Sequence, residues 1–150
     1  MDKRVIMLQS NHIAVYSDDI KFKEHLKELA SKDFSIIKSI ASNFLLPINN
    51  GYCPFTELAG KYKPSWEVNY CNSPMKDAFI KMAKAENLYH YHFGYKFYKD
   101  GYDEKYKGMV SDGILHVQLI HNIKEKVVTH RVVWIHLTHD PFSIPLLNIK

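Results

Sequence analysis

The chain has 150 residues, of which 46% are hydrophobic and 24% are charged, and its formal net charge is +4. This composition excludes global disorder, and no apolar run approaches the ~18 residues that span a bilayer, so we expect a cytoplasmic protein without membrane contact. The length fits a single domain over residues 1–150, and the slightly basic balance permits contact with nucleic acid without requiring it.

Apolar spacing in the first third of the chain predicts a strand followed by two helices. The strand covers residues 5–16 and ends at acidic residues that are good helix N-caps. Residues 22–30 and 34–44 carry apolar side chains at helical spacing, and the second helix is expected to end at Pro47.

Residues 47–74 carry several turn signals and are predicted to be irregular. A third helix is expected to open at Ser73 and Pro74, with the serine as its cap and the proline in its first position. Cys53 and Cys71 lie in the same segment. Because neither belongs to a C-x-x-C pair, a thiolate zinc site is disfavoured.

The C-terminal part of the chain predicts a sheet. From Leu88 the apolar period changes to two, which indicates strands over 88–98, 114–121 and 127–137 that pair antiparallel in sequence order. The order of the elements favours an α+β fold in which N-terminal helices pack on a C-terminal antiparallel β-meander.

Histidines are concentrated from residue 90 onward, where seven of the nine lie. His90 and His92 are two apart on a predicted strand, so both side chains should leave the same face of the sheet. Imidazole suits proton transfer near neutral pH, which makes this pair a candidate acid and base. Two alternatives stay open: the histidines are structural, or they bind a metal, although the carboxylate usual for such a site is missing after His92.

Aromatic and basic side chains alternate along residues 95–107, a pattern with which proteins hold single-stranded RNA. Three acidic residues nearly cancel the lysines of this stretch, so a plain solvated loop is the alternative. A second basic stretch, residues 61–84, is expected to border the same groove. The candidate RNA-binding residues are Tyr95, Tyr98, Lys96, Lys99, Lys61 and Lys63.

Two aspartates mark the ends of the predicted meander strands. Asp112 precedes the second strand and Asp140 follows the third. In an antiparallel meander these positions lie at the same end of the sheet, so we expect the two carboxylates to be neighbours in space. Turn chemistry alone is the alternative explanation for each.

Three short elements of the chain have a recognisable pattern: Leu88-Tyr89-His90-Tyr91-His92, Ser111-Asp112 with Leu115-His116-Val117, and Val133-Trp134-Ile135-His136-Leu137 with Asp140-Pro141. In this order they resemble the H-x-H strand, the S-D-x-x-L-V-Y element and the last strand of the YafO-type toxins. The upstream segment Leu58-Ala59-Gly60-Lys61-Tyr62-Lys63-Pro64 resembles their F-G-x-D-x-x-Y segment.

This resemblance implies a RelE-like toxin that cleaves mRNA on the ribosome and is held inactive by a cognate antitoxin protein. The basic residue that the family has just before Ser-Asp is replaced here by Met109-Val110, which leaves Lys107 as the nearest basic candidate. Phe142 stands where the family ends on a histidine.

We therefore expect a metal-independent endoribonuclease without a cofactor, in which the substrate 2′-OH attacks its own phosphodiester. Base and acid would come from two histidines, phosphate stabilisation from a cation, and the aspartates would orient a histidine or shape the site. The candidate catalytic residues are His90, His92, Lys107, Arg131, Asp112 and Asp140. The alternatives are a non-enzymatic binding or immunity-type domain with structural histidines and a His-ligated metal-dependent enzyme.

Overall fold

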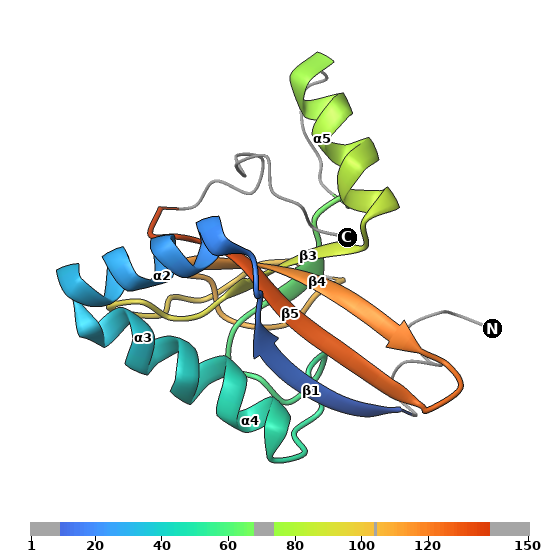
Figure 1. Cartoon of the computed structure of the whole chain (residues 1–150), viewed down its shortest axis with the longest axis horizontal. Coiled ribbons are helices and arrows are strands. Elements are labelled where there is room, and N and C mark those ends of the chain that lie inside the picture. Colours follow the sequence, from blue (N-terminus) through green and yellow to red (C-terminus); the bar gives the residue numbers. More distant parts are fainter. Residues whose placement is uncertain (1–9, 68–73, 104, 139–150) are drawn as a thin grey trace.

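The computed structural model of the chain describes residues 10–67, 74–103 and 105–138. Five strands form one sheet in the order β1-β5-β4-β3-β2, and the helices of residues 20–49 pack against one of its faces (Figure 1). The fold is therefore of the α+β class. The strands are β1 (Asn11–Tyr16), β2 (Tyr62–Pro64), β3 (Leu88–His92), β4 (Ile114–Asn122) and β5 (Val127–His136).

Two predicted helices are confirmed and begin at aspartate caps. Asp19 accepts a hydrogen bond from the Phe22 N–H at 3.1 Å and starts α2 (Ile20–Lys32). Asp33 accepts one from the Ser35 N–H at 3.0 Å and starts α3 (Phe34–Ile40). A carboxylate in this position satisfies an amide that has no partner within the helix and also favours the helix dipole.

The sequence predicted that the second helix ends at Pro47, but in the structure it continues past this residue. It continues through a wide turn, η1 (Ala41–Leu45), into α4 (Leu46–Asn49), and the Leu46 N–H donates to the Ala41 carbonyl five residues back. Such a π-helical turn lets a helix accommodate a proline, which lacks the amide proton and crowds the preceding turn.

This extension brings Asn49 against the outer edge of β1. The Asn49 amide accepts a hydrogen bond from the Ala14 N–H at 2.8 Å and donates one to the Ala14 carbonyl at 3.0 Å. An unpaired strand edge is a template for association with other chains. Asn49 therefore blocks the middle of the β1 edge.

The predicted meander is confirmed, since β3, β4 and β5 pair antiparallel in sequence order. Its first strand is shorter than predicted and ends at His92 rather than residue 98. Gly94 has φ +76° and Lys96 has φ +69°, a left-handed conformation that a strand does not adopt. These two residues turn the chain out of the sheet.

The fold differs in three ways from the predicted one, in which N-terminal helices pack on a C-terminal antiparallel sheet. β1 comes from the N-terminal part and pairs parallel with β5. β2, which falls in the segment predicted to be irregular, pairs antiparallel with β3 at the opposite edge, where its terminal Pro64 is tolerated. α5 (Pro74–Ala85) lies between β2 and β3 in the chain, so the helices are not all N-terminal.

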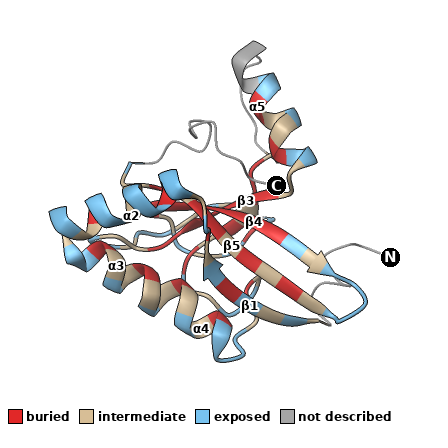
Figure 2. Cartoon of the chain, viewed as in Figure 1, coloured by how far each residue is buried: buried red, intermediate tan, exposed pale blue. Residues whose placement is uncertain are grey.

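Alternation along the strands divides the apolar residues between two clusters. Tyr89, Tyr91 and Leu115 face the helices and pack with Phe44, whose ring centroid lies 5.0 Å from that of Tyr91. On the other face α5 contributes a smaller cluster, formed by Phe79, Ala83, Leu88 and Val133. In Figure 2 buried residues mark the strands of the sheet and parts of α2–α4.

Gly60 is expected to tolerate no side chain. A Cβ there would lie 1.9 Å from the His92 carbonyl oxygen, a backbone atom that cannot move aside. We expect Gly60→Ala to lower the free energy of unfolding by about 3 kcal/mol, measured by chemical denaturation. Gly51→Ala is the matched control. A Cβ at residue 51 would have no neighbouring atom within 4 Å, so the alanine would be strained only by the φ of +96°, at a cost of about 1 kcal/mol. Equal losses in the two variants would contradict the packing at Gly60.

Candidate functional site

Four histidines lie on the sheet face opposite to α2–α4: His90 and His92 of β3, His116 of β4 and His136 of β5. His90 and His116 are cross-strand partners, and Ile114 joins His92 to His136 in the same way. Cross-strand partners project from the same face of an antiparallel sheet. The expectation that His90 and His92 share a face is confirmed, and we call the four residues the histidine cluster.

The closest contact in the cluster joins His116 and His136. His116 Nε2 lies 3.0 Å from His136 Nδ1, and the two rings are nearly perpendicular at 86°. A hydrogen bond between two imidazole nitrogens needs one donor and one acceptor, so one proton is shared between the rings. His116 is fully buried, whereas His136 is partly exposed and presents the pair to the surface.

His90 and His92 are held more deeply, with 2% and 1% of each residue exposed. Their ring centroids lie 5.9 Å apart. His90 Nδ1 lies 3.0 Å from Ser65 Oγ. His92 Nδ1 contacts the Ser111 backbone, 3.0 Å from its nitrogen and 2.7 Å from its oxygen. These contacts fix the orientation of both rings.

The Ser-Asp element at the start of the second meander strand serves as a clamp for His92. Besides its backbone contacts, Ser111 donates its hydroxyl proton to the Gly113 carbonyl at 2.8 Å and accepts a hydrogen bond from the Gly94 N–H at 3.0 Å. Asp112 is exposed, and within the described ranges no hydrogen bond to its carboxylate is found. Asp140 lies outside the described residues, so its expected proximity to Asp112 stays a prediction.

The structure places three of the predicted cations on the histidine face. Lys63 is the cross-strand partner of His90, and Lys61 lies two residues before it. Both ammonium groups contact Asp103, at 3.1 Å and 3.8 Å respectively, which joins β2 to the 95–107 loop. Burial, together with repulsion from Lys63, lowers the pKa of Lys61, and Asp103 offsets part of this effect.

Arg131 lies on the same face, across from Gln118, and donates a hydrogen bond to the Gln118 side-chain oxygen. That partner is a neutral amide, which itself donates a hydrogen bond to a Glu86 carboxylate oxygen at 3.4 Å. Lys107 is not part of this face. It is exposed and lines a separate cavity at the edge of β2.

The two tyrosines predicted to stack on RNA bases use their hydroxyls in structural hydrogen bonds. Tyr95 donates to Asp33 at 2.8 Å, a bond that raises the pKa of the Tyr95 hydroxyl. Tyr98 donates to the His92 carbonyl at 3.1 Å, and burial raises its pKa. Both bonds tie the loop to the core. Lys96 and Lys99 are exposed on the same loop.

His130 points the other way, into the core beneath the helices. Its Nε2 lies 2.8 Å from His12 Nδ1, and its Nδ1 lies 2.9 Å from the Tyr62 hydroxyl. Burial, and then repulsion from His12, lowers the pKa of His130 to about 3. His130 is therefore a neutral, structural histidine.

Sequence reasoning did not single out His116 and His136 for the site. Simple alternation places His130 and His136 on one face of β5, since six residues separate them. A β-bulge breaks the pairing, because His116 pairs with Trp134 whereas Val117 pairs with Val132. The extra residue, Val133, shifts the alternation and turns His136 to the opposite face. No local sequence signal marks this bulge.

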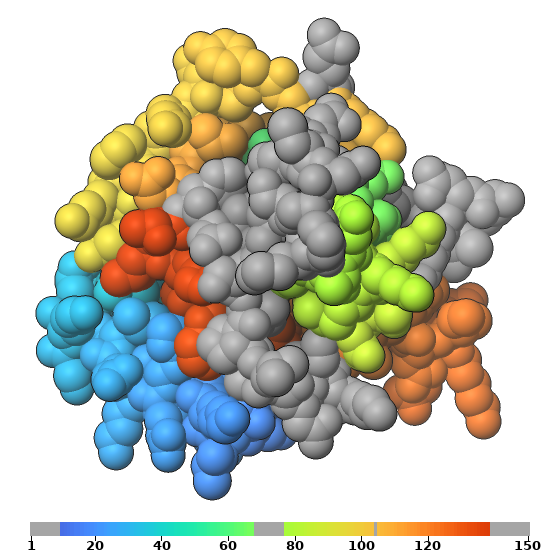
Figure 3. Space-filling view, turned by 90° about the horizontal axis from the view of Figure 1, so that it is seen from above, coloured from blue at the N-terminus to red at the C-terminus, as the bar shows by residue number. Residues whose placement is uncertain are grey.

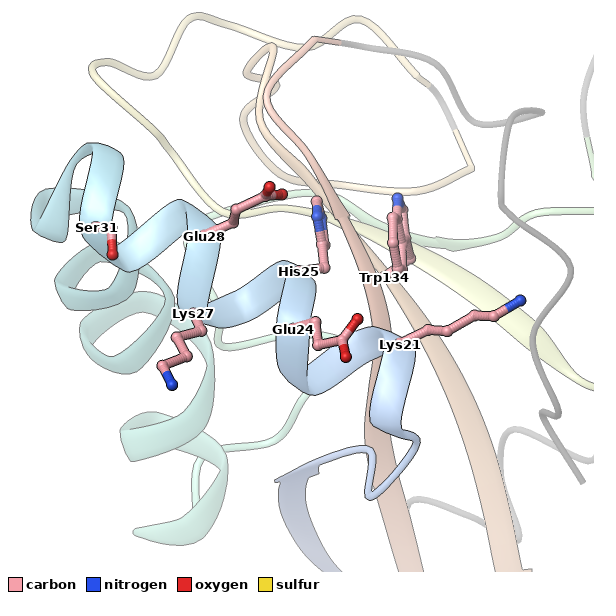
Figure 4. Close-up of a pocket in the computed structure, with 7 residues that line it drawn as sticks. All are labelled: Lys21, Glu24, His25, Lys27, Glu28, Ser31 and Trp134. Atoms are coloured by element: carbon pink, nitrogen blue, oxygen red, sulfur yellow. The ribbon is translucent and has the colours of Figure 1, made fainter.

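An aromatic stack extends the histidine face towards α2. His25 lies parallel to Trp134 with ring centroids 3.8 Å apart, and its Nε2 contacts the Ile135 carbonyl at 2.8 Å (Figure 4). Figure 3 shows α2 beside the end of β5 at this point. An open cavity of about 580 Å³ adjoins the stack, and two glutamates and two lysines line it: Glu24, Glu28, Lys21 and Lys27. Because these charges balance, the cavity has no excess of positive charge to attract a polyanion.

Neither metal ligands, nor membrane-spanning helices, nor similarity to known proteins assigns the described part of the chain to a class of protein. Within residues 10–67, 74–103 and 105–138, no three His, Cys, Asp or Glu side chains are grouped to hold a metal ion. No helix in the described part is long and apolar enough to cross a membrane. No protein-family model, curated protein or solved structure matches the chain, and the YafO-type resemblance stays a prediction.

Proposed function

We propose that the chain is an endoribonuclease whose chemistry takes place at the histidine cluster. The observation that carries the proposal is the hydrogen bond between His116 and His136, because it joins a buried imidazole to a partly exposed one. If His136 Nδ1 carries the shared proton, its Nε2 has a lone pair and acts as a base. If His116 Nε2 carries it, the neutral His136 bears its proton on Nε2 and acts as an acid.

RNA cleavage needs a base and then an acid, and His136 Nε2 would supply both functions in turn. As the base it takes the proton from the 2′-OH, and the oxygen attacks the adjacent phosphorus. The P–O5′ bond breaks, and the imidazolium of His136 gives this proton to the leaving 5′ oxygen, which leaves a 2′,3′-cyclic phosphate and a 5′-OH. Cations on the same face, Lys63 and Arg131, would stabilise the charge that develops on the phosphate.

This proposal changes the roles that the sequence suggested. His90 and His92 are almost fully buried, so we assign contact with the substrate to His136 and treat these two as positioning residues. His90 is the cross-strand partner of His116, so it would help to hold the imidazole of His116 in place beside His136. Lys107 belongs to a different surface and has no part in the chemical step.

The first test is cleavage of a short, fluorescently labelled RNA by the purified chain. We expect cleavage that continues unchanged in excess EDTA, because two histidines and the 2′-OH supply every proton transfer. Products would be separated on a denaturing gel. Activity that disappears with EDTA and returns with zinc or manganese would contradict the metal-independent mechanism.

The YafO-type resemblance adds the ribosome and a cognate antitoxin to this proposal. If the chain acts on translated mRNA, its induced expression should arrest growth, and cleavage should be faster with ribosomes than without them. Growth rate after induction is the measurement. If growth is normal and the cleavage rates with and without ribosomes are equal, the chain is an endoribonuclease but not a toxin that acts on the ribosome.

A non-enzymatic binding domain is the second candidate. The observation in its favour is that His90, His92 and His130 are buried and hydrogen-bonded, as structural histidines are. This reading becomes the better one if the purified chain cuts no RNA with or without ribosomes.

A further inference from the structure

A second cavity lies at the edge of the sheet, and β2 separates it from the histidine cluster. Its volume is about 420 Å³, within the ~300–1,000 Å³ of ordinary ligand pockets. Its walls are formed by residues 54–56 and Leu58, by Gly60 and by Tyr62 at the start of β2, and by residues 105–108. Alternation along β2 points Tyr62 to the helix side and Lys63 to the histidine side.

The wall formed by residues 105–108 is fixed against the segment that leads into β2. The Lys61 N–H donates to the Met109 carbonyl at 2.8 Å, and the Met109 N–H donates to the Ala59 carbonyl at 2.9 Å. Gly108 has φ +129°, and a Cβ there would lie 2.5 Å from the Lys61 nitrogen. Only glycine permits this close approach, so the cavity is held open in advance of any ligand.

Three aromatic side chains line the cavity. The Phe55 ring lies nearly parallel to that of Tyr62, at 19° with centroids 5.5 Å apart. Tyr106 is only 6% exposed, and the Lys63 and Lys105 ammonium groups lie 5.7 Å and 5.4 Å from its ring centroid. Tyr62 is buried as well, so the partly exposed Phe55 is the ring that offers a face to a nucleobase, and such stacking does not depend on the base.

The charged residues of the cavity are Lys105 and Lys107. The Lys105 ammonium lies 3.0 Å from a Glu67 carboxylate oxygen, which partly neutralises it. Among the residues that the structure describes, no ion pair involves Lys107 and no carboxylate lines the cavity. A cation beside aromatic rings selects an anion that carries a planar group.

From this combination we infer that the cavity binds a nucleoside monophosphate, either free or as one unit of an RNA chain. The phosphate lies at Lys107 and the base packs against Phe55. In the second case the inference rests on the proposed function, since a neighbouring nucleotide would cross β2 to reach the histidine cluster.

Calorimetric titration with AMP and UMP tests the site, with adenosine and inorganic phosphate as fragment probes. We expect both nucleotides to bind more tightly than either fragment. Lys107→Ala should weaken AMP binding by about tenfold or more, because a charge-assisted contact is lost. Lys124→Ala, which removes an exposed lysine from the distant β4–β5 turn, is the matched control and should bind like the parent.

A second variant fills the cavity instead of removing a charge. Thr56 lines the cavity and is exposed, so Thr56→Trp should exclude the base while the thermal melt stays at the parent's value. No nucleotide binding by the parent, or equal losses in Lys107→Ala and Lys124→Ala, would overturn the inference.

The RNA cleavage assay separates the two sources of the ligand. If the cavity holds a unit of the RNA, Lys107→Ala raises KM and leaves kcat unchanged. If it holds a free nucleotide, KM stays at the parent's value although AMP binding is weakened. A parent that binds AMP but cuts no RNA would leave this site intact and remove the proposed function.

Discussion

Changing His136 to asparagine is expected to lower the rate of RNA cleavage by about 10²–10⁴-fold, the usual loss when a general acid or base is removed. The asparagine amide can replace Nδ1 in the hydrogen bond to His116, so the buried ring keeps a partner. The fold should therefore change little, and we expect the free energy of unfolding to fall by no more than about 1 kcal/mol.

His121→Asn is the matched control for this experiment. His121 lies on β4 outside the histidine cluster, and its Nε2 contacts the Ser10 hydroxyl at 3.3 Å. We expect this variant to cleave RNA at the parent's rate. If His136→Asn melts like the parent and also cuts at its rate, the shared proton of the His116–His136 pair has no catalytic role.

Stability is expected to fall steeply below pH 6.5 because of His130. The unfolded chain binds a proton at this imidazole near pH 6.5, whereas burial lowers the folded pKa to about 3. Between these values the unfolded state binds more protons, so acidification favours unfolding by up to about 1.4 kcal/mol per pH unit. At pH 4.5 the loss attributable to His130 would be on the order of 2–3 kcal/mol.

Denaturant unfolding at pH 7 and pH 4.5 measures this effect. His130→Gln should be less stable than the parent at pH 7 but lose less stability on acidification, since the amide keeps polar partners for Tyr62 and His12 without titrating. The same loss on acidification in the parent and in His130→Gln would show that His130 does not control the acid response.

Local patterns in the sequence were sufficient for the helices at 20–32 and 34–40 and for the order of the meander strands. Each depends on side-chain periodicity, which a sequence displays directly. The shared face of His90 and His92 followed from the same alternation. The parallel pairing of β1 with β5 leaves no such mark, because it joins residues more than a hundred positions apart.

The rest of the site depends on small departures from regular geometry. A single extra residue, Val133, decides that His130 enters the core and that His136 joins the histidine cluster. The positive φ at Gly94 turns the aromatic loop back, so that the Tyr98 hydroxyl binds the His92 carbonyl. Tertiary packing settles both features, and the local residue pattern is compatible with either outcome.

The most direct test of the proposed chemistry uses an oligonucleotide with one ribonucleotide among deoxynucleotides. The account predicts a single cut, immediately 3′ of the ribonucleotide, with a 2′,3′-cyclic phosphate on one product and a 5′-OH on the other, and no cut in the all-deoxy control. Mass spectrometry of the products identifies these ends. Cleavage of the all-deoxy strand, products that carry a 5′-phosphate, or an intact oligonucleotide that contains the ribonucleotide would contradict attack by the 2′-OH.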